Sequence, residues 1–274
     1  DIDGAFSGIT NLSVSGASNI GANITTSGSQ TYAGAVTLSG GDRTLTGTSI
    51  NTQSTLAGGG NALAIAGAAD IDGALSGITN LSVSGTSNIG ANVTTTGTQT
   101  YSGAVTVSAA STLSTTNSNV TLGDSLSLAE NLSVNTGAGA GDILVAGAID
   151  GVKALSLSAG TGVITLSGAV GQTTRLGTIT LNSSGTTTLT QAVKAAGLTT
   201  NSGGTLLING GGVDTTGTQT YGDAITLGAD ATLIGSTINT QSTLDGGTSA
   251  LVITRSLMPG ANSAFRMGFM YFRI

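Results

Sequence analysis

The chain lacks histidine and cysteine, contains a single proline, and has few charged or aromatic residues. Only 7% of its 274 residues are charged and 3% are aromatic, whereas about a quarter of the residues in an ordinary globular domain are charged. Without His or Cys, neither a Ser/His/Asp triad nor a Cys/His dyad can form. Zinc ligation by these two residue types is excluded as well. The missing residues therefore argue against an enzyme.

The few charges are also poorly placed for polyanionic partners. The formal net charge is −6, and Arg255, Arg266 and Arg273 are three of only seven basic residues. Nucleic-acid binding needs clustered Lys and Arg, so we expect no nucleic-acid partner. Lys153 and Lys194 do not follow a Gly-rich phosphate-binding loop, and we expect no cofactor. The absence of an 18-residue apolar run predicts no transmembrane helix.

Internal repeats dominate the residues that are present. The segment Asp1–Gly40 reads DIDGAFSGITNLSVSGASNIGANITTSGSQTYAGAVTLSG, and Asp70–Ala109 reads DIDGALSGITNLSVSGTSNIGANVTTTGTQTYSGAVTVSA. The two copies are offset by 69 in the numbering, and 32 of the 40 positions are identical. The eight differences exchange apolar for apolar or small for small residues, as equivalent places in a stacked core require.

A third, shorter copy follows a divergent stretch. Val213–Gly228 reads VDTTGTQTYGDAITLG and matches Ile24–Ser39. We therefore divide the chain into a repeat domain, 1–254, and a tail, 255–274. The repeat domain comprises repeats 1–69 and 70–109, a divergent segment 110–212 and a third copy 213–253.

Short alternating units indicate an all-β fold. Segments such as NLSVSG, AVTLSG and VITLSG alternate apolar and small polar residues and end at Gly, which is typical of strands followed by turns. Repeated units of this kind stack naturally into a parallel β-solenoid. A coil of roughly 20–25 residues predicts about a dozen coils, and the long repeat would then span about three coils. A propeller or a barrel of repeated hairpins is the alternative.

The repeat style resembles that of the filamentous-haemagglutinin-type adhesins, which are close in architecture to autotransporter passengers. The resemblance rests on the NLSVSG and AVTLSG units, on TTTGTQTYSGAVTVS, and on GTGVITLSGAVGQTTRLGTITLNSSGTTTLTQAV at 161–193. It implies a right-handed parallel β-helix that is secreted and lies outside the cell or on the bacterial cell surface. The family offers no catalytic residues for transfer to this chain.

Two sets of equivalent residues are candidates for stacked ladders. Tyr32, Tyr101 and Tyr221 occupy the same place in the S/TQTY motif, and Asn11, Asn80 and Asn131 open the three NLSV segments. A row of Tyr side chains could bind sugar rings, but packing in the core or at a corner is the simpler interpretation. Stacked Asn side chains could form a buried ladder.

The paired acids in the DIDG segments are a further candidate site. Asp1 and Asp3, and equally Asp70 and Asp72, could offer oxygen ligands to Ca²⁺. Asp before Gly is also ordinary turn chemistry, and we favour turns over a metal site.

The tail has a different composition from the repeats. Its aromatic residues Phe265, Phe269, Tyr271 and Phe272 are candidate subunit contacts. The tail could instead cap the last coil, since the end of a solenoid exposes unpaired strand edges, or form a membrane-anchoring strand. We favour a cap or a subunit contact.

These observations favour a structural role. We expect a component of a bacterial surface fibre or adhesin, with a second copy of the chain, stacked head to tail, or surface glycans as partners. The head-to-tail expectation follows because residue 1 begins inside a repeat, where an open strand edge would accept another subunit. Thr-rich strand faces leave ice binding or glycan binding as alternatives, and a polysaccharide-active enzyme is a further one.

Overall fold

Alternation of apolar and small polar residues sets the local structure. In β13 (Val105–Val107), both valines are buried and Thr106 between them is exposed. Successive side chains of a strand point to opposite faces, so one side of each strand faces the core and the other faces solvent. The computed structural model describes residues 1–255 and 270–272, with side chains described for 1–255, and strands are its only regular elements.

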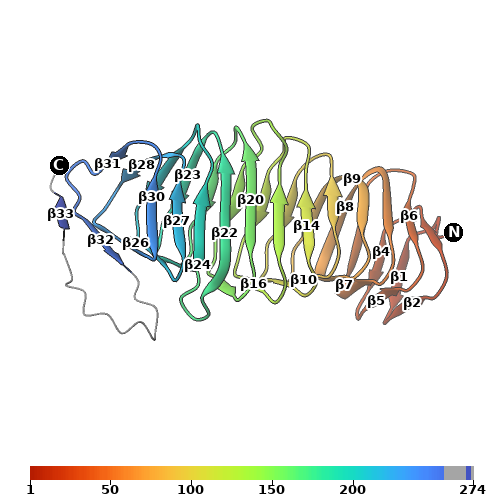
Figure 1. Cartoon of the computed structure of the whole chain (residues 1–274). Helices are drawn as coiled ribbons and strands as arrows, with labels where there is room; N and C mark the ends of the chain where they lie inside the picture. The colour runs from red at the N-terminus through yellow and green to blue at the C-terminus, as the bar shows by residue number, and fades with distance from the viewer. Residues whose placement is uncertain (256–269, 273–274) are drawn as a thin grey trace.

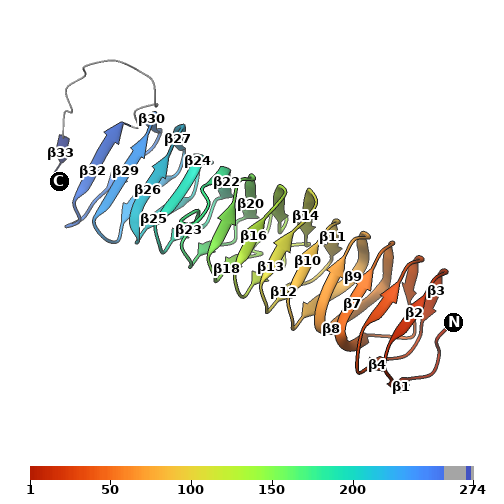
Figure 2. The same ribbon diagram turned by 90° about the horizontal axis from the view of Figure 1, so that it is seen from below.

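The chain winds into a rod of about 12 coils (Figures 1 and 2). Each coil contributes three strand segments, because β1 pairs with β4, β2 with β5 and β3 with β6, all in parallel. The coil length varies along the chain: Leu12 pairs with Gln30 in a short coil, and Leu155 pairs with Ile179 in a longer one. The predicted parallel β-solenoid of about a dozen coils is therefore confirmed. Its right-handed sense stays a prediction.

The three strand segments of each coil build three faces. Face A contains β2 (Leu12–Val14), β5 (Gln30–Tyr32), β10 (Ser87–Ile89), β13, β16 (Leu126–Leu128), β19 (Ile149–Gly151), β26 (Gly211–Thr215), β29 (Ala231–Gly235) and β32 (Leu251–Arg255).

Face B follows face A along the chain in each coil. It contains β3 (Ser18–Ile20), β6 (Val36–Leu38), β11 (Val93–Thr95), β14 (Ser111–Ser114), β17 (Leu132–Asn135), β20 (Leu155–Gly160), β22 (Leu176–Ser183), β27 (Thr218–Tyr221) and β30 (Thr237–Thr240).

Face C closes the coil. It contains β1 (Phe6–Ile9), β4 (Ile24–Thr26), β12 (Gln99–Tyr101), β15 (Val120–Leu122), β18 (Ile143–Val145), β21 (Ile164–Leu166), β23 (Thr186–Leu189), β25 (Thr205–Ile208), β28 (Ala224–Leu227) and β31 (Leu244–Asp245).

A few long strands turn corners and belong to more than one face. Examples are β7 (Arg43–Thr52), β8 (Leu56–Ile71), β9 (Leu75–Val83) and β24 (Val193–Thr200). At the other end of the rod from β1, β33 (Met270–Phe272) pairs antiparallel with β32. No helix in the described part of the chain is long and apolar enough to cross a membrane.

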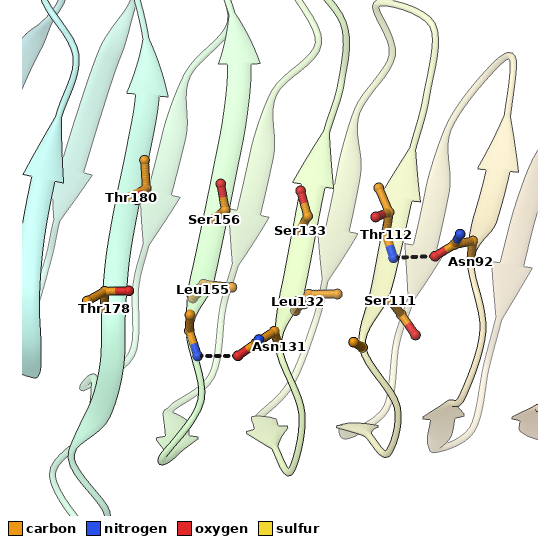
Figure 3. Close-up of a pocket in the computed structure, with 12 residues that line it drawn as sticks. Asn92, Ser111, Thr112, Asn131, Leu132, Ser133, Leu155, Ser156, Thr178 and Thr180 are labelled. Atoms are coloured by element: carbon orange, nitrogen blue, oxygen red, sulfur yellow. Dashed lines mark hydrogen bonds between the residues drawn. The ribbon is translucent and has the colours of Figure 1, made fainter.

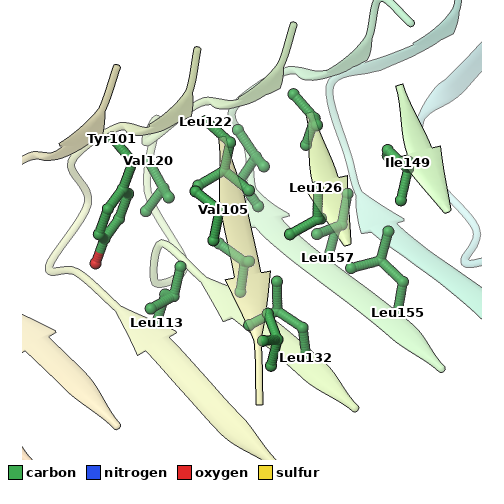
Figure 4. Close-up of a cluster of buried hydrophobic side chains, with 14 of the residues drawn as sticks. Tyr101, Val105, Leu113, Val120, Leu122, Leu126, Leu132, Ile149, Leu155 and Leu157 are labelled. Carbon is green, nitrogen blue, oxygen red and sulfur yellow. The ribbon is translucent and has the colours of Figure 1, made fainter. Parts of the chain in front are cut away.

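The core is a set of aliphatic columns that run along the rod (Figure 4). On face C, for example, Leu122, Val145 and Leu166 follow one another in register and are all buried. Each of these side chains packs against its equivalents in the coils before and after. Burial of a Val, Leu or Ile side chain stabilises the folded state by about 1.5–3 kcal/mol. The columns therefore supply much of the stability of the rod.

Stacked glycines form the corner between face C and face A over four successive coils. A Cβ on Gly85 would lie 2.6 Å from the carbonyl carbon of Gly67, and one on Gly67 would lie 1.8 Å from the oxygen of Gly47. A Cβ on Gly103 would meet the oxygen of Gly85 at 2.6 Å. The coils approach so closely here that only Gly fits.

Candidate functional site

A buried unit of three side chains recurs wherever the S/TQTY motif occurs. It consists of the Gln and the Tyr of the motif and of the Thr four residues before the Gln. In the first copy the Tyr32 hydroxyl donates to Gln30 Oε1 at 2.8 Å, and Gln30 Nε2 donates to the carbonyl oxygen of Thr46 in the next coil at 2.8 Å. Gln30 Nε2 also lies 3.5 Å from the Thr26 hydroxyl oxygen. Burial raises the pKa of the Tyr32 hydroxyl above its usual value. The unit thus satisfies polar groups inside the core.

The other two copies make the same contacts. The Tyr101 hydroxyl donates to Gln99 Oε1 at 3.1 Å, and the Tyr221 hydroxyl donates to Gln219 Oε1 at 2.7 Å. Burial raises the pKa of both hydroxyls. All three Tyr side chains are 0% exposed, so none of them offers a ring surface to a sugar in solution. They belong to the core, as the simpler interpretation of the sequence holds.

The structure does not bring the three tyrosines together, and the expected Tyr ladder is wrong. Tyr32 lies on face A between Val14 and Thr52, and Tyr101 lies on face C between Val83 and Leu122. Tyr221 lies on face B between Thr200 and Thr240. Each equivalent tyrosine therefore belongs to a different face.

The phase of the repeat explains this arrangement. The column that starts at Tyr32 passes through Thr52, Ile71 and Ile89 and reaches Val107 after four coils. Val107 lies in the strand that follows the strand of Tyr101. The long repeat therefore spans one strand fewer than four coils, and the expected length of about three coils is wrong. The same sequence consequently moves by one face between copies.

Asn11 and Asn80 connect coils, but they too do not form a ladder with each other. Asn11 Oδ1 accepts from the backbone N–H of Ser29 at 2.8 Å, and Asn80 Oδ1 accepts from that of Thr98 at 2.9 Å. Asn11 precedes a strand of face A, whereas Asn80 precedes the face C part of β9. The ladder expected from these residues is therefore wrong, again because the long repeat does not span a whole number of coils.

The contact that Asn11 and Asn80 make with the next coil is repeated at other Asn and Asp residues along the chain, and we call it the Asx clamp. In each case a side-chain oxygen accepts from a backbone N–H of the next coil at 2.7–3.0 Å. Because the N–H donor needs an oxygen acceptor, the amide nitrogen of an Asn clamp is not the atom used. Further clamp residues are Asn23, Asp42, Asn92, Asn119, Asn131, Asp142 and Asp230.

The second DIDG segment lies at the end of a long strand. Asp70 belongs to β8 and accepts from Asn88 Nδ2 at 2.7 Å, and Asp72 follows that strand as an exposed residue. Desolvation raises the pKa of Asp72, and the neighbouring Asp70 carboxylate raises it further. In the described part of the chain, no group of three or more His, Cys, Asp or Glu side chains is placed to hold a metal ion.

An open groove lies on face B, with a volume of about 470 Å³ (Figure 3). Hydroxyl side chains from successive coils lie in a row along it: Thr112 is in register with Ser133, Ser133 with Ser156, and Ser156 with Thr180. Two clamp residues, Asn92 and Asn131, border the row. The lining residues are Asn92, Ala110, Ser111, Thr112, Asn131, Leu132, Ser133, Ala154, Leu155, Ser156, Thr178 and Thr180.

The groove is electrically neutral. None of its lining residues ionises. Glu130 and Lys153 lie next to Asn131 and Ala154 in the sequence, and they form an ion pair of 2.9 Å. The two nearby charges therefore offset each other at the rim of the groove.

The candidate contacts of the tail are outside what the structure describes in detail. Phe265 and Phe269 lie outside the described residues, and for Tyr271 and Phe272 only the backbone in β33 is described. Their role as subunit contacts stays a prediction.

The class that the fold defines is the parallel β-solenoid. No protein-family model, curated protein or solved structure matches the chain. Sequence reasoning missed both the Asx clamps and the groove. The clamps did have a signal, because an Asn or Asp directly precedes an apolar–polar–apolar strand at several places, as at Asn80 and Asn119. The groove had none, because its residues come from separate coils.

Proposed function

We propose that the chain is a structural segment of an extracellular bacterial surface fibre or adhesin. The observation that carries the proposal is the parallel pairing that continues from β1 to β32 and makes the chain a rod. With strands about 4.8 Å apart, twelve coils give a rod of roughly 60 Å. The sequence resemblance to filamentous-haemagglutinin-type adhesins supports the same role.

The proposal assigns mechanical and display functions to the rod. Backbone hydrogen bonds run along its axis, so a pulling force on the ends acts on many bonds that break in succession. The outward strand residues are small and mostly uncharged, and they present a surface for many weak contacts. End-to-end association of subunits would extend the rod into a filament.

Electron microscopy of the purified chain tests this proposal. We expect rods of roughly 60 Å at low concentration and end-to-end filaments at high concentration. Only dispersed rods at high concentration would overturn the polymerisation, and compact particles would overturn the fibre role as a whole. Release of reducing or unsaturated ends from polysaccharides would show an enzyme instead.

Ice binding is a second candidate because of one feature of face B. Thr180, Thr199 and Thr220 follow one another in register on adjacent coils and continue the hydroxyl row of the groove. Such a row could order water. Thermal hysteresis that is lost in Thr199→Tyr would favour ice binding, and its absence in the unmodified chain would eliminate this candidate.

A further inference from the structure

The groove on face B has a repeating chemistry that points to a polymeric ligand. Thr112, Ser133, Ser156 and Thr180 place one hydroxyl group in each successive coil. Coils follow one another at about 4.8 Å along the rod axis. A ligand that lies along this axis would meet the same group at every step, and this suits a chain of similar units better than a compact molecule.

The hydrogen-bonding groups of the groove are available. The side-chain hydroxyls of Thr112, Ser133, Ser156 and Thr180 form no hydrogen bond with another described residue. Asn92 and Asn131 use Oδ1 in their clamps, to the N–H groups of Thr112 and Ala154, so their Nδ2 atoms keep two donors each. The groove thus offers hydroxyl groups, which donate and accept, beside amide donors. A polyhydroxylated ligand complements both.

The charge and the shape of the groove limit the class of ligand further. A groove without ionisable lining residues gives no attraction to anionic polymers, because such recognition relies on Arg and Lys. Several lining residues are small Ser and Ala, and the groove stays open over several coils (Figure 3). A neutral, extended and hydroxyl-rich chain fits these conditions.

We propose that the face B groove is a binding site for a neutral polysaccharide strand that lies along the rod axis. This inference rests on the proposed adhesin function and specifies its partner. Since hydrogen bonds formed in exchange for water contribute little each, a single site binds weakly, with a Kd of roughly 1 mM. Association of rods into a fibre would raise the avidity through multiple sites.

Titration of the 274-residue chain with cellohexaose and maltohexaose, followed by NMR of the Asn side-chain amide signals, tests the site. We expect shifts of the Asn92 and Asn131 amide signals with at least one of these sugars. Oligogalacturonate, an acidic probe, should bind more weakly. Binding of the neutral sugar should not change between low and high salt, since no charge is involved.

Matched variants separate the groove from the fold. Asn131→Asp keeps the clamp oxygen, as Asp142 does in the native chain, but removes the Nδ2 donor. Asn23→Asp makes the same change at a clamp outside this groove. Ser156→Gln extends a side chain into the groove. We expect about tenfold weaker binding in Asn131→Asp and Ser156→Gln, and unchanged binding in Asn23→Asp.

The outcomes distinguish this inference from the proposed function. If neither neutral sugar binds, or if Asn131→Asp and Asn23→Asp bind equally, the inference is wrong even where microscopy shows rods and filaments. If sedimentation shows side-by-side dimers that Ser156→Gln dissociates and no sugar binds, the occupant is a second copy of the chain. Compact particles in the microscope would instead contradict the fibre.

Discussion

The two long copies of the repeat, residues 1–40 and 70–109, share most of their residues but differ in burial over their first strands. Phe6 is 36% exposed, whereas its equivalent Leu75 is 1% exposed. Leu12 is half-buried and pairs only with Gln30 in the next coil. Its equivalent Leu81 is 1% exposed and pairs with residues of both neighbouring coils. The local sequence therefore determines where a strand forms, whereas burial of its apolar side chains depends on the coils stacked on either side.

Later in the two copies the difference disappears. Ile20 and Ile89 are both buried, and so are Tyr32 and Tyr101, although the equivalent residues lie on different faces. The three faces are thus interchangeable environments for one strand sequence. In repeat proteins of this kind, stability is approximately a sum of unit and neighbour terms.

Replacement of equivalent leucines should give the largest difference in stability between the two copies. We expect Leu81→Ala to lower the free energy of unfolding by about 3 kcal/mol, because it leaves a cavity between two coils. Leu12→Ala should cost about 1 kcal/mol, since this side chain is partly hydrated already. Urea unfolding followed by circular dichroism measures both values. Equal losses would contradict the role given to the neighbouring coils.

Glycine replacement probes the corners in the same way. A Cβ on Gly85 would lie 2.6 Å from the backbone of Gly67, whereas nothing lies within 4 Å of a Cβ on the equivalent Gly16. We expect Gly85→Ala to destabilise the chain by about 1–3 kcal/mol and Gly16→Ala to change stability by less than about 0.5 kcal/mol. Thermal unfolding of the two variants provides the comparison, and a neutral Gly85→Ala would show that the corner is less tightly packed.

The buried tyrosines should show no difference between copies. Tyr32→Phe and Tyr101→Phe each remove a hydroxyl donor and leave a buried Gln oxygen without that partner. We expect a loss of about 1 kcal/mol in both cases. Denaturant unfolding of the pair checks this expectation. A clear difference would mean that the faces are not equivalent.

In the third copy of the repeat, a buried carboxyl group should make the stability of the folded chain depend on pH. Asp223 stands at the place of Gly34 and Gly103 and is 1% exposed. Its Oδ1 accepts from the N–H of Gly204 at 2.9 Å, whereas Oδ2 has no partner among the described residues. Desolvation raises the pKa of this carboxyl, against the opposing hydrogen bonds from Gly204 and Thr200.

A raised pKa means that the folded chain holds the proton more tightly than the unfolded chain. The stability linked to Asp223 is therefore full below the unfolded pKa and is lost as the pH rises through the folded pKa. We expect Asp223→Asn to raise stability at neutral pH by about 1 kcal/mol, and to lose this advantage toward the ordinary Asp pKa of about 3.8. Unfolding measured from pH 3 to pH 8 gives the profile. An effect that is the same at all pH values would contradict the assignment.

The strand pattern could be predicted because alternation and terminal Gly act locally, as in VTL of β6. The phase of the repeat could not be predicted, because a unit of one strand fits any of the three faces and the coil length varies along the chain. The ladders expected at Tyr32 and Asn11 failed for this reason. The face B groove joins Asn92 to Thr180, so only the stacking of distant coils reveals it.

Engineered disulfides test the arrangement of coils most directly, because the native chain has no Cys. Thr106 and Ser127 are in register on adjacent coils of face A, whereas Thr121 belongs to face C. The Cα atoms of Thr106 and Ser127 should be about 5 Å apart, within the range for a disulfide. We predict that Thr106→Cys with Ser127→Cys forms a disulfide in the folded chain and that Thr106→Cys with Thr121→Cys does not. The opposite result would contradict the three-faced solenoid.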